Sequence, residues 1–193
     1  GCAVPGTDPP GRWHGLAVAC LASGPSLTQA DCALVREAGV RTITCNDTIK
    51  RAPWADIALA ADHGWWQQHM HEMPEGPERW TCSYAAVREF PELELFRTNL
   101  ATRNTGAKAI ELAIHLGAKR VVLLGYDCSL RHGIHWHGPH ERTTNPDEKV
   151  ISDWVGHFEL MAEFARAHDV QVLNCSRDTA LECFERRPLE DVL

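Results

Sequence analysis

Short apolar runs alternate with amphipathic segments along the chain, and this alternation predicts its secondary structure. Residues 15–23, GLAVACLAS, form an apolar run that ends in small residues, which is typical of a buried strand. A helix is predicted next, with Thr28 as its N-cap and Gly39 at its C-terminal stop. Two further strands, each ending at a polar residue, are predicted at residues 41–46 and 55–62.

The second half of the chain shows the same alternation more clearly. Apolar residues recur at helical spacing within residues 104–118. The run KRVVLLGYD at 119–127 follows; it does not alternate, and this indicates a strand buried on both faces. Residues 145–169 predict the longest helix and residues 170–176 a last strand. Weaker signals, for a short helix and two strands, come from residues 63–73, 78–83 and 93–98.

This order of elements predicts the fold class and the place of a ligand site. Strands that alternate with helices indicate a Rossmann-like α/β fold, a mainly parallel sheet with helices on both faces. The length of 193 residues suits a single domain, expected at residues 15–193, after a flexible Gly- and Pro-rich arm at residues 1–14. Ligands of such sheets bind beyond the carboxyl ends of the strands, so the polar residues that follow the strands are the candidate site.

Composition narrows the class of protein. A net charge of −7 argues against a nucleic-acid backbone binder, which needs a basic face. No apolar run approaches the roughly 20 residues of a membrane span. The eight cysteines contain no C-x-x-C pair, and several lie in apolar strand-like runs, so reduced core thiols in a cytoplasmic protein are favoured over a disulfide framework.

The turn SGPSL after the first strand is the first candidate for ligand contact. Ser23 ends the strand, Gly24 removes side-chain bulk where a ligand approaches, and Pro25 stiffens the turn. The Ser26 hydroxyl and the N–H groups after it lie at a predicted helix start, where the helix dipole favours an anion such as phosphate. An ordinary strand-to-helix turn is the alternative interpretation.

Three later strand ends carry further candidates. Asn46 offers an amide to a base or ribose. In the segment RNTGAKA, Thr105 and Gly106 open a helix and Arg103 offers a bidentate phosphate contact. Lys108 is a further candidate for this contact, although a solvated surface lysine is the favoured interpretation. In LLGYD, Gly125 has no side chain and so permits close approach of a ligand, and the carboxylate of Asp127 could orient a hydroxyl.

The segment LRHGIHWHGPH holds four histidines, and three interpretations of it stay open. His135, His137 and His140 have a spacing that could hold zinc, which needs three or four ligands at about 2 Å. A single general base, His135 or His137, is favoured, because a neutral imidazole can take a proton from an acceptor hydroxyl. Solvated loop histidines are the third interpretation.

The acceptor side of the site is predicted after the third strand. Asp62 and His63 follow that strand, and the indole of Trp66 could line a pocket for a sugar or heterocycle. A buried aromatic pair under a helix is the equally weighted alternative.

These motifs, in this order, resemble a known family. ASGPSL, then CND, then RNTGAKAIELAIHLGAKRVVLLGYD and a His-containing loop are similar to the small bacterial sialyltransferases and their phage and prophage relatives. The chain also looks like the 6-hydroxymethylpterin pyrophosphokinase-like proteins, which share the G-P-S-L turn and a strand ending in G-x-D. The similarity spans residues 16–180. One departure is NTG in place of the T-S-G of the sialyltransferases.

The resemblance implies a nucleotide-dependent transferase. It implies a glycosyltransferase that takes a cytidine-nucleotide sugar, binds the nucleotide through Gly24, Pro25, Ser26 and Asn46, and acts on a small-molecule or glycan acceptor without a metal. One alternative is a Mg²⁺-dependent pyrophosphokinase acting on a pterin-like heterocycle, with Asp62 and Asp127 as metal carboxylates. Another is a non-catalytic phage protein that binds a nucleotide. Mg²⁺ and Zn²⁺ thus remain alternatives, as does a homo-oligomer, and the cytoplasm of a bacterial host or phage-infected cell is the expected location.

Overall fold

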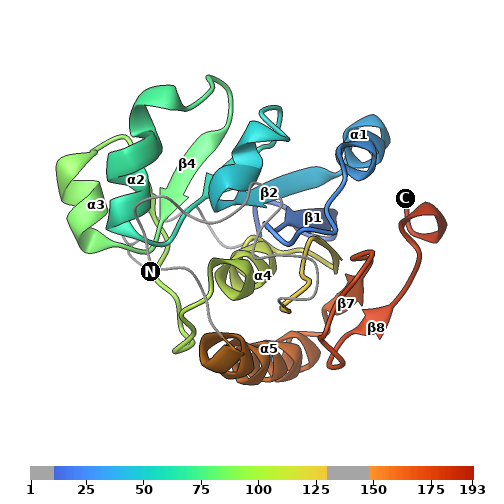
Figure 1. The fold of residues 1–193 in the computed structure, drawn as a ribbon. Coiled ribbons are helices and arrows are strands. Elements are labelled where there is room, and N and C mark those ends of the chain that lie inside the picture. The colour runs from blue at the N-terminus through green and yellow to red at the C-terminus, as the bar shows by residue number, and fades with distance from the viewer. Residues whose placement is uncertain (1–10, 130–147) are drawn as a thin grey trace.

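A single sheet of parallel strands organises the protein. The structure is a computed structural model that describes residues 11–129 and 148–193. Among the described residues the sheet has eight strands in the order β5-β4-β3-β2-β1-β6-β7-β8, and neighbouring strands pair in parallel (Figure 1). The strands are β1 (Ala17–Leu21), β2 (Arg41–Cys45), β3 (Ile57–Leu59), β4 (Glu78–Thr81), β5 (Glu94–Leu95), β6 (Arg120–Leu124), β7 (Gln171–Asn174) and β8 (Glu185–Arg186). The predicted Rossmann-like α/β class is confirmed.

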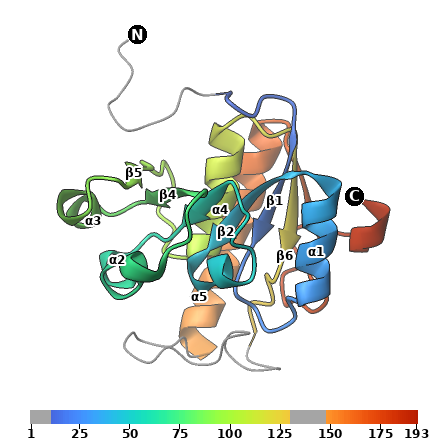
Figure 2. The ribbon, with the colours of Figure 1, turned by 90° about the horizontal axis from the view of Figure 1, so that it is seen from above.

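Helices connect the strands and cover both faces of this sheet. They are α1 (Gln29–Ala38), α2 (His63–His69), α3 (Tyr84–Glu89), α4 (Thr105–His115) and α5 (Glu148–Ala167), with short 3₁₀ helices η1 (Asn46–Lys50), η2 (Met70–Glu72) and η3 (Leu189–Asp191). Figure 2 shows α1 on one side of the central strands and α4 and α5 on the other. The strand order runs outward from β1 in both directions, so it reverses between β1 and β6.

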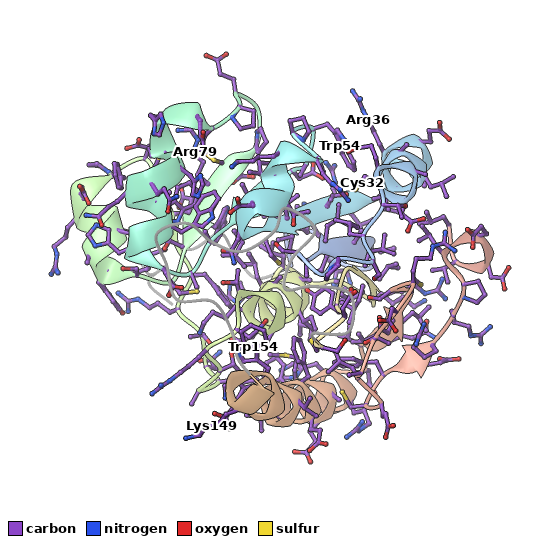
Figure 3. The ribbon with its side chains drawn as sticks, in the orientation of Figure 1. Cys32, Arg36, Trp54, Arg79, Lys149 and Trp154 are labelled. Atoms are coloured by element: carbon purple, nitrogen blue, oxygen red, sulfur yellow. The ribbon has the colours of Figure 1, made fainter. Side chains whose placement is uncertain are left out.

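The alternation of side chains along the strands produces a separate core on each face. In β1, Val18 and Cys20 pack with α4 and α5, while Ala19 and Leu21 pack with α1. The whole of β6 after its first residue is buried, as its non-alternating run predicted. On α5, Trp154 lies on the side that packs into the core, and Lys149 is exposed (Figure 3).

Helix ends follow the capping residues of the sequence. The Thr28 hydroxyl accepts from the backbone N–H of Asp31 at 3.0 Å, and Gly39 ends α1 with φ 70°, so both predictions for this helix are confirmed. Asn104 caps α4 by accepting from the N–H of Ala107 at 3.1 Å. Asn145, at which the longest helix was predicted to begin, lies outside the described residues.

One expectation needs correction, and two short elements were not predicted. Residues 11–14 do not belong to a loose arm, because Trp13 is buried, its backbone N–H donates to the carbonyl of Leu116 at 2.6 Å, and Arg12 forms an ion pair with Glu78. Helix α3 and strand β8 were not expected from the pattern at all, since each is too short to show a period. Within the described ranges, no helix is both long and apolar enough to cross a membrane.

Candidate functional site

The turn after β1 and the turn after β6 bind each other at the point where the strand order reverses. The N–H of Gly24 donates to the carbonyl of Gly125 at 2.8 Å. The N–H of Ser26 donates to Asp127 Oδ2 at 2.9 Å and its hydroxyl donates to Asp127 Oδ1 at 2.6 Å. The structure therefore brings together four predicted site residues that are about a hundred positions apart in the chain.

Asp127 links these two turns through its carboxylate. It is buried, and both of its carboxylate oxygens accept hydrogen bonds from Ser26. Burial raises the pKa of this carboxyl above its ordinary value, and the two donors of Ser26 oppose that shift. The Ser26 hydroxyl and N–H are thus already used, so their contribution to a ligand site is to fix the shape of the turn.

Ser26→Ala should destabilise the protein. The variant removes a short hydrogen bond to a buried carboxylate, so we expect the free energy of unfolding to fall by about 1.5–3 kcal/mol in urea titrations. Ser129→Ala is the matched control, because the Ser129 side chain makes no hydrogen bond to another described residue. Equal stability of the two variants would contradict a stabilising role of the hydrogen bonds between Ser26 and Asp127.

Both glycines of these turns are required by backbone packing. A Cβ on Gly24 would lie 2.2 Å from Asp127 Oδ1 and 2.3 Å from the carbonyl oxygen of Gly125. Gly125 has φ 76°, and a Cβ there would lie 2.4 Å from the carbonyl oxygen of Ala22. The close approach that the sequence predicted is therefore to the neighbouring turn.

The end of β2 presents one uncommitted polar side chain. Ser23 is buried and its hydroxyl contacts the Cys45 carbonyl at 3.2 Å and the Thr48 hydroxyl at 3.0 Å. Asn46, the next residue after β2, has φ 52° and is half-buried. Its amide makes no hydrogen bond to any other residue that the structure describes. A positive φ is tolerated by Asn better than by most residues, and such positions concentrate at functional sites.

The first turn of α4 lies against the ends of β2 and β6. The Cys45 thiol approaches the carbonyl of Thr105 at 4.0 Å, and the Tyr126 hydroxyl donates to the carbonyl of Gly106 at 2.9 Å. A Cβ on Gly106 would lie 3.0 Å from the Tyr126 ring, which explains the glycine. Within the described ranges, the N–H groups of Thr105 and Gly106 have no acceptor. They are two of the donors that a helix start leaves unsatisfied.

The structure gives less support to the other residues predicted to contact a ligand. Arg103 is exposed, and its backbone N–H donates to His157 Nδ1 at 3.4 Å. Asp62 is exposed at the start of α2, where its side chain makes no capping hydrogen bond. His63 is paired with Glu89. Trp66 is fully buried and donates to the carbonyl of Ala60 at 2.9 Å, so in this conformation its indole offers no face to a ligand.

Sequence reasoning missed a buried polar cluster beside β2. Asp47 accepts from Trp65 Nε1 at 2.8 Å and from Lys50 at 3.3 Å, and the ring of His69 lies 3.7 Å from it. His69 is also hydrogen-bonded to Glu72, and this contact holds the pKa of Glu72 below its ordinary value. The cluster fixes η1 and so holds Asn46 at the strand end.

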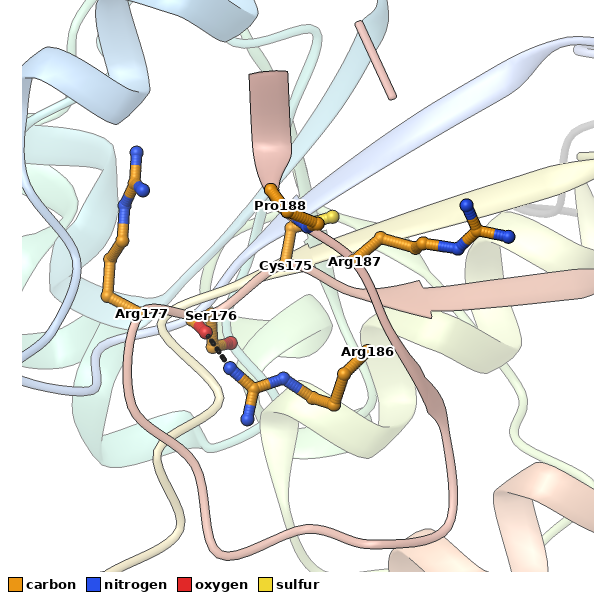
Figure 4. Close-up of a pocket in the computed structure, with 6 residues that line it drawn as sticks. All are labelled: Cys175, Ser176, Arg177, Arg186, Arg187 and Pro188. Carbon is orange, nitrogen blue, oxygen red and sulfur yellow. Dashed lines mark hydrogen bonds between the residues drawn. The ribbon is translucent and has the colours of Figure 1, made fainter. Parts of the chain in front are cut away.

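A hollow lies at the carboxyl ends of β7 and β8. It has a volume of about 260 Å³ and is lined by Cys175, Ser176, Arg177, Arg186, Arg187 and Pro188 (Figure 4). Arg177 is already paired with Asp31 and Glu190, and Arg187 with Glu185. Arg186 donates to the Ser176 carbonyl at 2.7 Å. The guanidinium groups point in different directions, so they do not converge on one anion (Figure 4).

The histidine segment and a metal site are not found among the described residues. His132, His135, His137 and His140 lie outside the described residues. Within residues 11–129 and 148–193, no group of three or more His, Cys, Asp or Glu side chains is placed to hold a metal ion. The seven described cysteines have free thiols, and burial raises the pKa of Cys32 to about 11 and that of Cys45 to about 12.

Comparisons with known proteins give only a distant likeness. No protein-family model matches the sequence, and no curated protein matches it. UDP-glucose 4-epimerase from Brucella ovis, solved with NAD, superposes with a TM-score of 0.35 and 13% identity over 84% of this chain and 51% of the epimerase chain. UDP-glucose 4-epimerase from Thermotoga maritima, solved with UDP-glucose, gives 0.31 and 14% over 81% and 54%. The chain spans about half the length of these epimerases.

A likeness of this degree says nothing about activity. The fold class rests on the strand order and on the parallel pairing described above.

Proposed function

We propose that the protein binds a nucleotide at the carboxyl ends of β1, β2 and β6 and transfers a group from it. The observation that carries this proposal is the start of α4, where the N–H groups of Thr105 and Gly106 have no acceptor among the described residues. A helix start with free N–H groups favours a phosphate. This start adjoins the ends of β2 and β6, next to the reversal of strand order where ligands of such sheets bind.

Asn46 supplies the second contact in this proposal. Its amide is half-buried and uncommitted among the described residues, and Cys45 beside it touches the first turn of α4. An amide both donates and accepts, so it can pair with the polar edge of a base or with ribose hydroxyls. The phosphate then lies at α4 and the nucleoside lies over the end of β2.

The resemblance to the sialyltransferases makes a glycosyl group from a cytidine-nucleotide sugar our preferred transfer. In that reaction the acceptor hydroxyl attacks the sugar carbon that bears the phosphate, the bond to the phosphate oxygen breaks, and the nucleotide leaves with the bonding electrons. His135 or His137 takes the hydroxyl proton. The Mg²⁺-dependent alternative is less well supported, because both oxygens of Asp127, one of its two carboxylates, already accept from Ser26.

Calorimetric titration with CMP, CDP, UDP, ADP and GDP tests the proposal. We expect binding of the cytidine nucleotides without added metal. Asn46→Gly should weaken that binding by about 10-fold, since it removes the amide but tolerates φ 52°. Asp169→Gly is the matched control, because Asp169 also has a positive φ, 54°, in the turn before β7.

The outcomes separate the candidates. Failure of every nucleotide to bind would overturn the proposal. Binding of ATP that appears only with Mg²⁺ would favour the pyrophosphokinase. Tight nucleotide binding without turnover of any donor would favour the non-catalytic alternative.

A further inference from the structure

A buried lysine lies on the first turn of the same helix. Lys108 is only 8% exposed, although its position in the sequence had suggested a solvated surface residue, and that expectation is wrong. Its ammonium group forms no hydrogen bond and no ion pair with any residue in the described ranges. Removing an ammonium from water without a partner is costly, so a buried lysine normally has an anion beside it.

The acidic neighbours of Lys108 are engaged elsewhere or too far away. Glu111 lies almost one turn further along α4, and its carboxylate accepts from the Thr98 hydroxyl at 2.7 Å and from the N–H groups of Asn99 and Leu100 at 3.1 and 3.2 Å. Asp62 forms no ion pair with Lys108 within 4 Å. The structure therefore supplies no direct counter-ion for Lys108 from these residues.

The charge of Lys108 acts on Cys82, which lies at the same edge of the sheet. Cys82 directly follows β4, at the carboxyl edge of the sheet. Burial raises the pKa of this thiol to about 11, the charge of Lys108 acts in the opposite direction, and the charges of Glu111 and Asp62 add to the rise. Side chains of a helix tilt toward its N-terminus, so Lys108, in the first turn, leans toward the edge at which α4 begins.

We propose that Lys108 binds a phosphate oxygen of the nucleotide, together with the free N–H groups of Thr105 and Gly106. This inference rests on the proposed function for the identity of the anion. One anion placed there satisfies three groups that otherwise lack partners among the described residues. The N–H groups give direction and the ammonium gives charge, as in other phosphate sites that combine a helix start with a lysine.

The sign of a stability change distinguishes this role from a structural one. In the absence of ligand, Lys108→Met removes a charge that has no partner among the described residues, and it keeps the length of the side chain. We therefore expect an unchanged or higher unfolding temperature together with a loss of about 10- to 100-fold in affinity for CMP. Lys108→Arg, which keeps the charge, should retain most of the affinity.

The experiment uses the intact chain with CMP, cytidine and inorganic pyrophosphate as probes. Lys119→Met is the matched control, because Lys119 is exposed at the opposite edge of the sheet, just before β6. The loss of affinity should appear for CMP and pyrophosphate, and the control should lose none.

Each outcome bears on one of the two proposals. If the protein binds CMP and Lys108→Met binds it equally well, the role of Lys108 is overturned and the nucleotide site stands. If it binds pyrophosphate through Lys108 but no nucleotide, the anion site stands and the proposed function fails. A lower unfolding temperature of unliganded Lys108→Met, with unchanged affinity in the folded fraction, would identify Lys108 as a structural residue.

Discussion

Gly24→Ala should lower the free energy of unfolding by about 3 kcal/mol, toward the upper end of the range for overpacked sites. The added Cβ would lie 2.2 Å from Asp127 Oδ1 and 2.3 Å from the carbonyl oxygen of Gly125. Neither atom can move freely, because Asp127 is held by Ser26 and Gly125 belongs to the backbone after β6. The backbone of Gly24 has no positive φ, so the cost is one of contact alone.

Gly156→Ala is the matched control for this variant. Gly156 lies within α5, and a Cβ there would meet nothing within 4 Å. The same chemical change should therefore stabilise the protein by about 0.5–1 kcal/mol, through the higher helix propensity of alanine. Urea unfolding of the two variants measures the contrast. Similar effects of both would show that the turns after β1 and β6 are not locked as described.

A shifted turn should also change ligand affinity. The contact between the turns places the ends of β1 and β6 side by side, and α4 rests on β6 through the hydrogen bond from Tyr126 to Gly106. Displacing the turn at Gly24 would therefore move the phosphate site at α4 only indirectly. Nucleotide binding of folded Gly24→Ala should fall less than that of Asn46→Gly.

The sequence predicted where polar residues gather but not which of them are free. Apolar runs end at polar residues, so the strand ends and the carboxyl edge could be located from the pattern alone. Whether Ser26 faces a ligand depends on Asp127, which is 101 positions away and becomes a neighbour only because β1 pairs with β6. No local pattern contains that pairing.

Lys108 shows a second limit of pattern reasoning. Ala107, Ile110 and Ile114 define the apolar stripe of α4, and Lys108 lies off that stripe. In the fold, α4 packs against the central strands and α5, while Glu111 binds the segment before the helix, so all residues from Thr105 to Ile114 are buried. Periodicity identifies the side of a helix that faces the sheet. It gives no information about what covers the other sides.

The histidine segment yields the largest expected effect on activity. The segment directly follows Ser129, which is two residues after Asp127, the residue that binds Ser26 at the end of β6. If His135 or His137 is the general base, replacing that residue by Ala should slow release of CMP from the sugar donor by about 100- to 10,000-fold. Affinity for CMP should stay unchanged, because the base acts on the acceptor hydroxyl.

A set of single variants separates this mechanism from zinc chemistry. A general base predicts that only one of His135→Ala and His137→Ala abolishes turnover, and that His140→Ala and the exposed control His71→Ala change little. A zinc site predicts that His135→Ala, His137→Ala and His140→Ala each abolish turnover and lower the zinc content of the purified protein, since three ligands act together. Full turnover in all four variants would remove the histidine segment from the mechanism and leave nucleotide binding at Asn46 and α4 as a separate question.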